Sequence, residues 1–206
     1  CVKIGLDMPD FYNSLAESDL QRYAEQAGLG GDNPIDLQHF LKILKKGDKI
    51  LEVGFGTGRL AKHFIKEFDY TGIDIHKPYV EHFAKYLRSV GFKNVTKLIR
   101  MCSFQDFDES GFDAVLFPWT VIGDFNKEEQ IEAIKKAKKI LNSGGVILID
   151  NPAKETVYNK IEGYNPVKFY FHAWEEKLSK MGFSNIKCKL YSTNTGRVRE
   201  IAILKK

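Results

Sequence analysis

The chain has 206 residues, of which 43% are hydrophobic and 28% charged, a composition typical of one globular domain with a sizeable core. No apolar run approaches the ~20 residues of a membrane span, and three widely spaced cysteines form no metal or disulfide framework, so we expect a cytoplasmic protein without a bound metal. The net charge of +4 comes largely from lysines of residues 135–139 that alternate with apolar residues, which favours a solvated helix face over a nucleic-acid surface.

The first 47 residues are predicted to form a helical accessory segment. Apolar residues at helical spacing predict a helix over residues 11–27, which the glycines of residues 28–31 end. A second helix is expected between Asp36, as its N-cap, and Gly47. The whole chain, residues 1–206, is then one domain made of two parts, residues 1–47 and an α/β core of residues 48–206.

Strands and helices alternate along the core, which predicts a parallel sheet with helices on both faces. The strands are expected near 49–54, 70–75, 95–101, 112–118 and 145–150, and the helices near 58–68, 78–90 and 127–141. The end of the chain departs from this alternation. A helix over 171–181 precedes strands at 185–193 and 197–205, and the short connection Asn194-Thr195-Gly196 makes the two strands an antiparallel hairpin.

A glycine-rich turn follows the first expected strand, in the pattern E-x-G-x-G-x-G from Glu52 to Gly58. A strand, a glycine turn and a helix let bare backbone approach a nucleoside-sized ligand. Asp74 closes the next strand at about the 20-residue offset at which a carboxylate meets a ribose hydroxyl. The dinucleotide fingerprint G-x-G-x-x-G would require glycine where Arg59 stands, so a dehydrogenase is the minor alternative.

This pattern resembles motif I of the class I methyltransferases, which use S-adenosylmethionine (SAM). The resemblance continues in Asp74, in the Phe112-Asp113 opening of the fourth strand, in Gly144-Gly145 before the fifth strand and in the terminal hairpin. It implies a doubly wound, seven-stranded, mostly parallel sheet with a C-terminal antiparallel hairpin. It also implies that the N-terminal helices form a lid over bound SAM.

The resemblance implies a set of cofactor-binding residues at the carboxyl ends of the strands. Asp74 would hold the ribose diol, or else cap a helix, and Glu52 would order the glycine loop. Ile75 would pack on the adenine. Tyr12 would lie in the lid helix, with a packed aromatic as its alternative. The complete set is Tyr12, Glu52, Gly54, Phe55, Gly56, Gly58, Asp74, Ile75, Ser103, Phe104 and Phe117.

Members of the family often place an acidic residue after the third strand, where it receives the adenine amino group. Cys102 and Ser103 stand there in this chain. Ser103 can substitute through its hydroxyl with Phe104 beside the ring, or Asp106 can take the acidic role. Cys102 itself is expected to be a small buried side chain.

The acceptor pocket is expected at the end of the fourth strand, residues 117–120, and in residues 151–174. The stretch Phe117-Pro118-Trp119-Thr120 only partly matches the Asn/Asp-Pro-Pro-aromatic motif of amino-base methyltransferases. Trp119 is therefore interpreted as an aromatic wall of the acceptor site, with core packing as the alternative. The aromatic side chains expected to enclose this pocket are Tyr158, Tyr164, Phe169, Tyr170, Phe171 and Trp174.

Methyl transfer from a sulfonium is an in-line displacement in which the protein mainly positions the reactants, and a base is needed only for a protonated acceptor. A catalytic residue is thus not assigned. His172 and Tyr12 are the first candidates, Asp124 and His76 weaker ones. The remaining histidines are expected on solvent-facing helix positions: His39, His63 and His82.

We therefore expect a SAM-dependent methyltransferase that acts on nitrogen or oxygen of a small molecule. RNA or protein is the less favoured acceptor, motivated by the positive charge and by residues 117–119. A non-catalytic SAM-binding subunit of another methyltransferase is a further alternative. The intact glycine motif and Asp74 favour the active enzyme.

Overall fold

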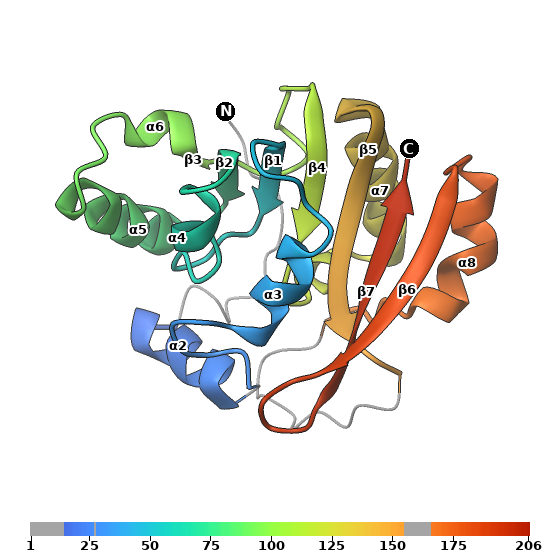
Figure 1. Ribbon diagram of the computed structural model, residues 1–206, viewed down its shortest axis with the longest axis horizontal. Coiled ribbons are helices and arrows are strands. Elements are labelled where there is room, and N and C mark those ends of the chain that lie inside the picture. The colour runs from blue at the N-terminus through green and yellow to red at the C-terminus, as the bar shows by residue number, and fades with distance from the viewer. Residues whose placement is uncertain (1–14, 27, 155–165) are drawn as a thin grey trace.

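A computed structural model of the chain describes residues 15–26, 28–154 and 166–206. Its centre is a seven-stranded sheet in the order β3-β2-β1-β4-β5-β7-β6 (Figure 1). The strands are β1 (Lys49–Val53), β2 (Asp69–Asp74), β3 (Ile99–Met101), β4 (Phe112–Phe117), β5 (Leu141–Pro152), β6 (Asn185–Ser192) and β7 (Val198–Lys205). The helices are α2 (Glu17–Gln26), α3 (Ile35–Leu41), α4 (Ala61–Phe64), α5 (Lys77–Ser89), α6 (Val95–Leu98), the 3-10 helix η1 (Val121–Asp124), α7 (Lys127–Ile140) and α8 (Phe171–Lys180).

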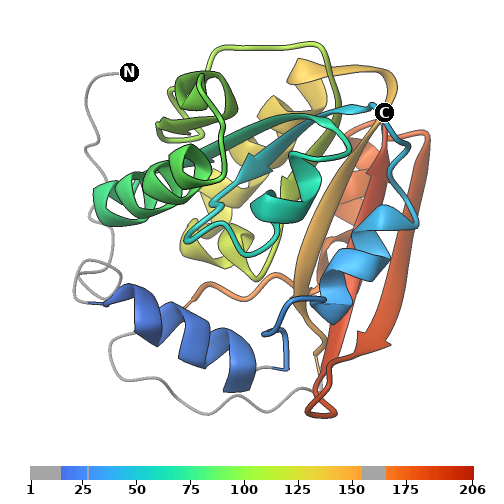
Figure 2. The same cartoon turned by 60° about the vertical axis from the view of Figure 1, so that its left-hand side comes forward.

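Strands β1 to β5 run parallel, and β7 inserts antiparallel between β5 and β6. The chain order reverses between β1 and β4, and open α/β sheets bind ligands outside the carboxyl ends of the strands at such a point. Figures 1 and 2 place α2 on the side of the sheet to which β1 and β4 point. The predicted doubly wound sheet with its C-terminal antiparallel hairpin is confirmed.

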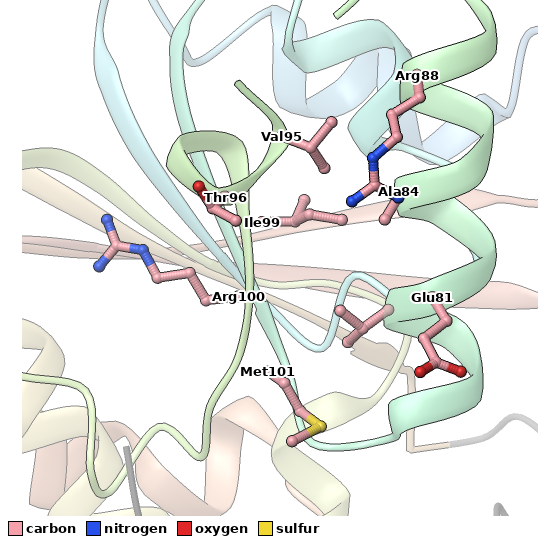
Figure 3. A pocket seen from close by; sticks show the side chains of 9 residues that line it. Glu81, Ala84, Arg88, Val95, Thr96, Ile99, Arg100 and Met101 are labelled. Carbon is pink, nitrogen blue, oxygen red and sulfur yellow. The ribbon is translucent and has the colours of Figure 1, made fainter. Parts of the chain in front are cut away.

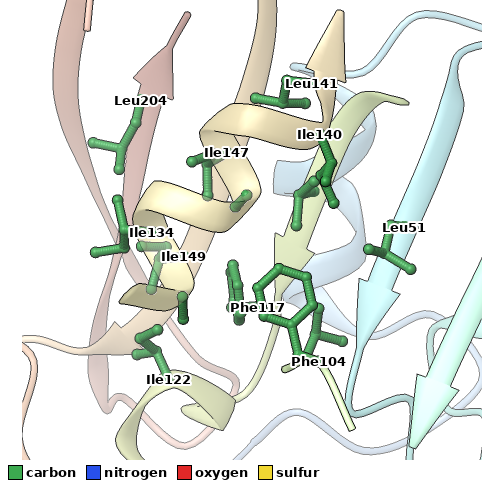
Figure 4. Packing of buried hydrophobic residues seen from close by; sticks show 14 of the residues in the cluster. Leu51, Phe104, Phe117, Ile122, Ile134, Ile140, Leu141, Ile147, Ile149 and Leu204 are labelled. Carbon is green, nitrogen blue, oxygen red and sulfur yellow. The ribbon is translucent and has the colours of Figure 1, made fainter. Parts of the chain in front are cut away.

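Successive side chains of a strand point to opposite faces, and each face buries its own hydrophobic layer. Helices α7 and α8 cover one face, where Phe117, Ile134 and Ile147 pack together (Figure 4). Helices α3, α4 and α5 cover the other face, where Phe40 and Phe64 pack. The amphipathic pattern of each helix therefore becomes one of two buried layers around the sheet.

Three expected elements differ from the structure. Residues 95–98 form helix α6, not the start of a strand, and β3 is a three-residue edge strand. A short edge strand exposes few unpaired backbone groups, and the helical turn buries Val95 against α5. The expected helix at 58–68 is reduced to α4, flanked by turns. Strand β5 begins directly after α7, at Leu141, which pairs with Phe112.

The lysines of α7 are less solvated than predicted. Lys136 donates from Nζ to the carbonyl of Gln105 at 2.6 Å, and Lys138 donates to the carbonyl of Met181 at 2.6 Å. The Nζ of Lys136 also lies 5.6 Å from the centre of the Phe104 ring, and the Nζ of Lys138 lies 4.9 Å from the centre of the Phe183 ring. Two of the charges that suggested a solvated face thus anchor neighbouring loops.

None of the helices in the described ranges has the length and hydrophobicity that crossing a membrane requires. Over the same ranges, no three His, Cys, Asp or Glu side chains come together as a metal site would require. The start of the predicted first helix and Tyr12 lie outside the described residues, as do Tyr158 and Tyr164.

Candidate cofactor and acceptor site

The glycine loop joins the end of β1 to α4, and three of its residues adopt left-handed backbone conformations. The φ angles are 72° at Gly54, 57° at Gly56 and 86° at Gly58, a region that favours glycine. A Cβ at Gly58 would lie 2.2 Å from the ring of Phe83, so the absence of a side chain at Gly58 lets the loop pack closely against Phe83. At Gly56 the nearest atom is Cδ1 of Leu20 in α2, 3.9 Å away, so its backbone lies open beneath α2.

Asp74 ends β2 and ties this loop to the second strand. Its Oδ2 accepts the backbone N–H of Gly56 at 2.8 Å, and its Oδ1 accepts the backbone N–H of His76 at 2.9 Å. His76, not Asp74, is the N-cap of α5, so the alternative of a helix cap is wrong. The ring Nδ1 of His76 also lies 3.1 Å from Oδ1. A carboxylate has about four acceptor positions, so Asp74 keeps capacity for one further donor, such as a ribose hydroxyl.

Helix α2 lies against the same edge of the sheet. Burial raises the pKa of Tyr79 to about 12, and the negative charges of Asp74 and Asp19 add to that rise. Asp19 belongs to α2, so the charge of this helix acts on α5, while Leu20 of the same helix approaches the glycine loop. Ile75 is half-buried immediately beyond Asp74. The geometry thus brings the predicted residues Gly54, Gly56, Asp74 and Ile75 to one place.

Glu52 lies below the loop, inside the layer between the sheet and its helices. Its side chain is 1% exposed and accepts a hydrogen bond from the Tyr70 hydroxyl at 2.7 Å. Burial raises the pKa of Glu52 to about 7, although the Tyr70 hydrogen bond and the charge of Arg59 oppose the rise. Gly72, opposite Glu52 in β2, makes room for the Tyr70 hydroxyl, which would be 2.3 Å from a Cβ there. Glu52 therefore joins β1 to β2 beneath the loop.

Arg59 is a residue of this site that the sequence did not reveal. Its guanidinium binds Asp36 through two hydrogen bonds of 2.8 and 2.6 Å and donates to the Leu29 carbonyl at 3.0 Å. Asp36 was expected to cap α3, and this is wrong, because Pro34 is the N-cap and Asp36 is fully buried against Arg59. The guanidinium also lies 5.4 Å from the centre of the Trp119 ring. Arg59 thus joins the N-terminal segment, the glycine loop and the end of β4.

The turn after β4 is strained. Trp119 and Thr120 have φ angles of 43° and 70°, and a left-handed conformation costs roughly 1–2 kcal/mol at a residue other than glycine. Asp150 holds this turn: its Oδ2 accepts the N–H of Trp119 at 3.0 Å, and its carbonyl accepts the N–H of Thr120 at 2.9 Å. Strain of this kind gathers at functional sites.

Two side chains of the C-terminal hairpin hold the Asp150 carboxylate in place. Arg199 donates to it through Nε and Nη2, and the Tyr191 hydroxyl donates at 2.7 Å. Asp150 is fully buried and Arg199 is 4% exposed, so this is a buried ion pair. No motif in the sequence indicated Asp150 or Arg199, since isolated charges in a chain are usually on the surface.

The residues expected around the adenine lie partly in the core. Phe104 and Phe117 pack edge to face at 5.4 Å, with exposures of 3% and 0%. Ser103 donates from Oγ to Asp106 at 2.8 Å, so the two candidates for the adenine contact are already joined. Cys102 is 2% exposed, as expected. Cofactor contact by these residues stays a prediction.

The candidates for a base are dispersed. His172 is exposed in the first turn of α8, and Asp124 is half-buried in η1. The expectation of solvent-facing histidines is wrong: His39, His63 and His82 are each half-buried, and burial lowers the pKa of His39 and His63.

Several aromatic residues expected to enclose the acceptor pocket instead serve the core. Phe169 stacks on Trp174 with ring centres 5.0 Å apart, and Phe171 is 4% exposed beside them. Tyr170, which lies between Phe169 and Phe171 in the sequence, is half-buried.

A groove of about 620 Å³ lies between α5 and β3, at the outer edge of the sheet (Figure 3). None of the predicted cofactor residues lines it. Its walls are Val80, Glu81, Ala84, Arg88, Val95, Thr96, Ile99, Arg100 and Met101.

Comparison with known proteins points to the same family. Residues 50–145, which contain the glycine loop, Asp74 and the strained turn, match the family described as "Methyltransferase domain". Over this range the chain is similar to methyltransferase domains, and its sheet has the order of the class I methyltransferase fold. The resemblance seen in the glycine loop, in Asp74 and in the hairpin is thereby confirmed, and the match favours a methyltransferase over a dehydrogenase. No match was found among curated protein sequences.

Solved structures share the fold of this chain at low identity. The 1,6-didemethyltoxoflavin-N1-methyltransferase of Burkholderia thailandensis, with 1,6-didemethyltoxoflavin and S-adenosylhomocysteine bound, is 16% identical with a TM-score of 0.71, covering 100% of this chain and 93% of its own. Phosphoethanolamine N-methyltransferase 2 of Haemonchus contortus, in complex with SAM, is 14% identical with a TM-score of 0.73, covering 98% of this chain and 60% of its own. The [4+2]-cyclase SpnF is 15% identical with a TM-score of 0.65, and the match covers 82% of this chain and 80% of SpnF.

Proposed function

We propose that this protein transfers the methyl group of SAM to a nitrogen or oxygen atom of a small-molecule acceptor. The observation that carries the proposal is the Asp74 carboxylate bound to the open backbone of Gly56 within a methyltransferase domain. This arrangement offers a carboxylate for a ribose diol and a glycine backbone for the rest of a nucleoside. The residues at the end of β1 and β2 therefore fit SAM.

SAM held there would supply a methyl group on a sulfonium, which a nitrogen or oxygen atom of the acceptor would take in line, with S-adenosylhomocysteine as the leaving group. The protein contributes by fixing geometry. Asp74 and the glycine loop hold the donor side. Trp119, with its turn fixed by Asp150, lies on the acceptor side next to Arg59. An acceptor that loses a proton can pass it to solvent or to a base, and no described residue needs to be that base.

Two of the structural neighbours support a small acceptor. The Burkholderia thailandensis neighbour is an N1-methyltransferase of 1,6-didemethyltoxoflavin, and a neighbour from Nostoc punctiforme is described as a putative O-methyltransferase. SpnF is a cyclase with the same fold, which shows that a fold does not fix a function. The reaction must therefore be tested directly. The use of Lys136 and Lys138 as internal anchors weakens the case for RNA.

The test is transfer of labelled methyl groups from SAM. Purified protein is incubated with a metabolite extract, and separately with total RNA and with protein at low and high salt. We expect label in small molecules, insensitive to salt, and none in the Asp74→Ala variant. Label in RNA alone, falling steeply with salt because phosphate contacts release counterions, would refute the small-molecule acceptor. Labelling that appears only after a second protein is added would instead favour a supporting subunit.

A further inference from the structure

Asn151 is a buried amide that has no hydrogen-bond partner in the described part of the chain. It lies at the carboxyl end of β5, is 1% exposed, and neither its Oδ1 nor its Nδ2 has a hydrogen-bond partner among the described residues. Native proteins satisfy the large majority of their buried polar side-chain atoms, so an amide with both ends unsatisfied calls for an explanation.

The neighbours of Asn151 are occupied elsewhere. Glu200 lies opposite Asn151 in β7, but its Oε1 accepts the N–H of Phe171 at 2.8 Å and its Oε2 receives the thiol of Cys188 at 3.8 Å. The preceding residue, Asp150, binds Arg199, Tyr191 and the turn after β4. The polar groups around Asn151 are thus satisfied without it, and its amide stays available.

Asn151 lies on the side of the sheet where the proposed function puts the acceptor. In the parallel register of β4 and β5, Phe117 is opposite Ile149, and two residues further along these strands come Trp119 and Asn151. The glycine loop and Asp74 lie on β1 and β2, on the other side of β4. A ligand that reaches Asn151 therefore lies on the far side of β4 from Asp74, where the proposed function puts the acceptor.

We propose that Asn151 recognises the acceptor through a paired hydrogen bond, and that the acceptor carries a donor and an acceptor atom side by side, as in a lactam, a ureide or a carboxamide. This inference rests on the proposed function and deepens it. One planar group can satisfy Oδ1 and Nδ2 of the amide at once when it presents such an edge. A group with one polar atom, or a charged group, leaves one end of Asn151 unsatisfied.

The first test uses stability, because an unsatisfied buried amide costs free energy that an apolar side chain of similar shape does not. In the ligand-free protein, Asn151→Leu is expected to raise the melting temperature. Gln130→Leu is the matched control: Gln130 is also fully buried, but its Nε2 donates to the carbonyls of Ile122, Phe125 and Val167. That variant is expected to lower the melting temperature. A fall in melting temperature for Asn151→Leu would show that the amide has structural partners and would overturn the inference.

The second test uses two probes in the presence of S-adenosylhomocysteine: 2-pyridone, which has N–H and C=O side by side, and N-methyl-2-pyridone, which lacks the donor. Saturation-transfer NMR is expected to show at least about tenfold tighter binding of 2-pyridone to the wild type, as the loss of one buried hydrogen bond predicts, and no preference in Asn151→Leu. Equal binding of both probes to the wild type, no binding of either, or a preference that survives in the variant would overturn the inference.

The two proposals fail differently. If S-adenosylhomocysteine binds and label enters small molecules, but the probes show no preference, the role of Asn151 alone is wrong. If neither S-adenosylhomocysteine nor SAM binds to the wild type, the proposed function is wrong, and the role of Asn151 falls with it.

Discussion

Glu52 is a carboxyl group enclosed by the fold, with the Tyr70 hydroxyl as its hydrogen-bond partner. Burial raises its pKa from 4.5 to about 7. Below pH 4.5 the group is protonated in the folded and the unfolded chain alike. Between pH 4.5 and pH 7 only the unfolded chain loses the proton, so the free energy of unfolding falls as pH rises, and above pH 7 the difference is constant.

We predict that Glu52→Gln removes this part of the pH dependence. The shift from 4.5 to about 7 corresponds to about 3 kcal/mol, because one pKa unit is worth about 1.4 kcal/mol. Urea unfolding at pH 5 and pH 8 should therefore show a smaller fall in stability for the variant than for the wild type. Glu67→Gln, at an exposed position, is the control and should keep the full fall. An unchanged pH dependence in Glu52→Gln would show that Glu52 is not the group that titrates.

Single residues also show where sequence reasoning stops. The glycines and Asp74 could be predicted because short spacing fixes their geometry. The buried pairs Asp36 with Arg59 and Asp150 with Arg199 could not, since their members are 23 and 49 positions apart and nothing in a sequence marks a charge as buried. The strained turn was also missed, because positive φ at a tryptophan has no local signal.

At the scale of elements, the glycine loop combines two different requirements. Gly58 faces Phe83, whereas Gly56 faces open space beneath α2. Both glycines have positive φ, so backbone strain alone does not distinguish them. Their surroundings do, and this gives a pair of matched variants.

We predict that Gly58→Ala unfolds the protein or strongly destabilises it, because the added methyl group would clash with Phe83. Gly56→Ala should remain folded, with a loss of roughly 1–2 kcal/mol for the left-handed conformation, but should bind S-adenosylhomocysteine poorly. Gly144→Ala, with a φ of 75° and no atom within 4 Å of its Cβ, controls for the strain and should bind normally. Calorimetric titration and urea unfolding measure the two effects. Normal binding by a folded Gly56→Ala would show that the ligand lies elsewhere.

Other elements were predicted in type but not in extent. Helix α7 and the terminal hairpin match the sequence closely, since amphipathic spacing and the Asn194-Thr195-Gly196 connection are local signals. Helix α6 was predicted as a strand because short apolar runs fit both structures. Whether this run forms a helix or a strand depends on its position at the edge of the sheet beside β2. That position exists only once the sheet has assembled.

At the scale of the whole molecule, the site joins parts that lie far apart in the sequence. Arg59 connects the N-terminal segment to the loop and to Trp119, while Asp150 connects the end of β4 to the terminal hairpin. A ligand bound among these parts stabilises the folded chain as a whole, because it binds the folded state and not the unfolded one.

We predict that S-adenosylhomocysteine at about 100 times its Kd stabilises the protein by about 2.7 kcal/mol, which for a chain of this size raises the melting temperature by roughly 5–10 °C. In Asp74→Ala the ribose loses charge-assisted hydrogen bonds worth about 1.5–3 kcal/mol, so the same concentration should give less than half of that rise. Asp69→Ala, at the exposed start of the same strand, should respond like the wild type. NADH should leave the melting temperature unchanged. A full rise in Asp74→Ala, or a rise with NADH in place of S-adenosylhomocysteine, would contradict the placement of a SAM nucleoside at the ends of β1 and β2.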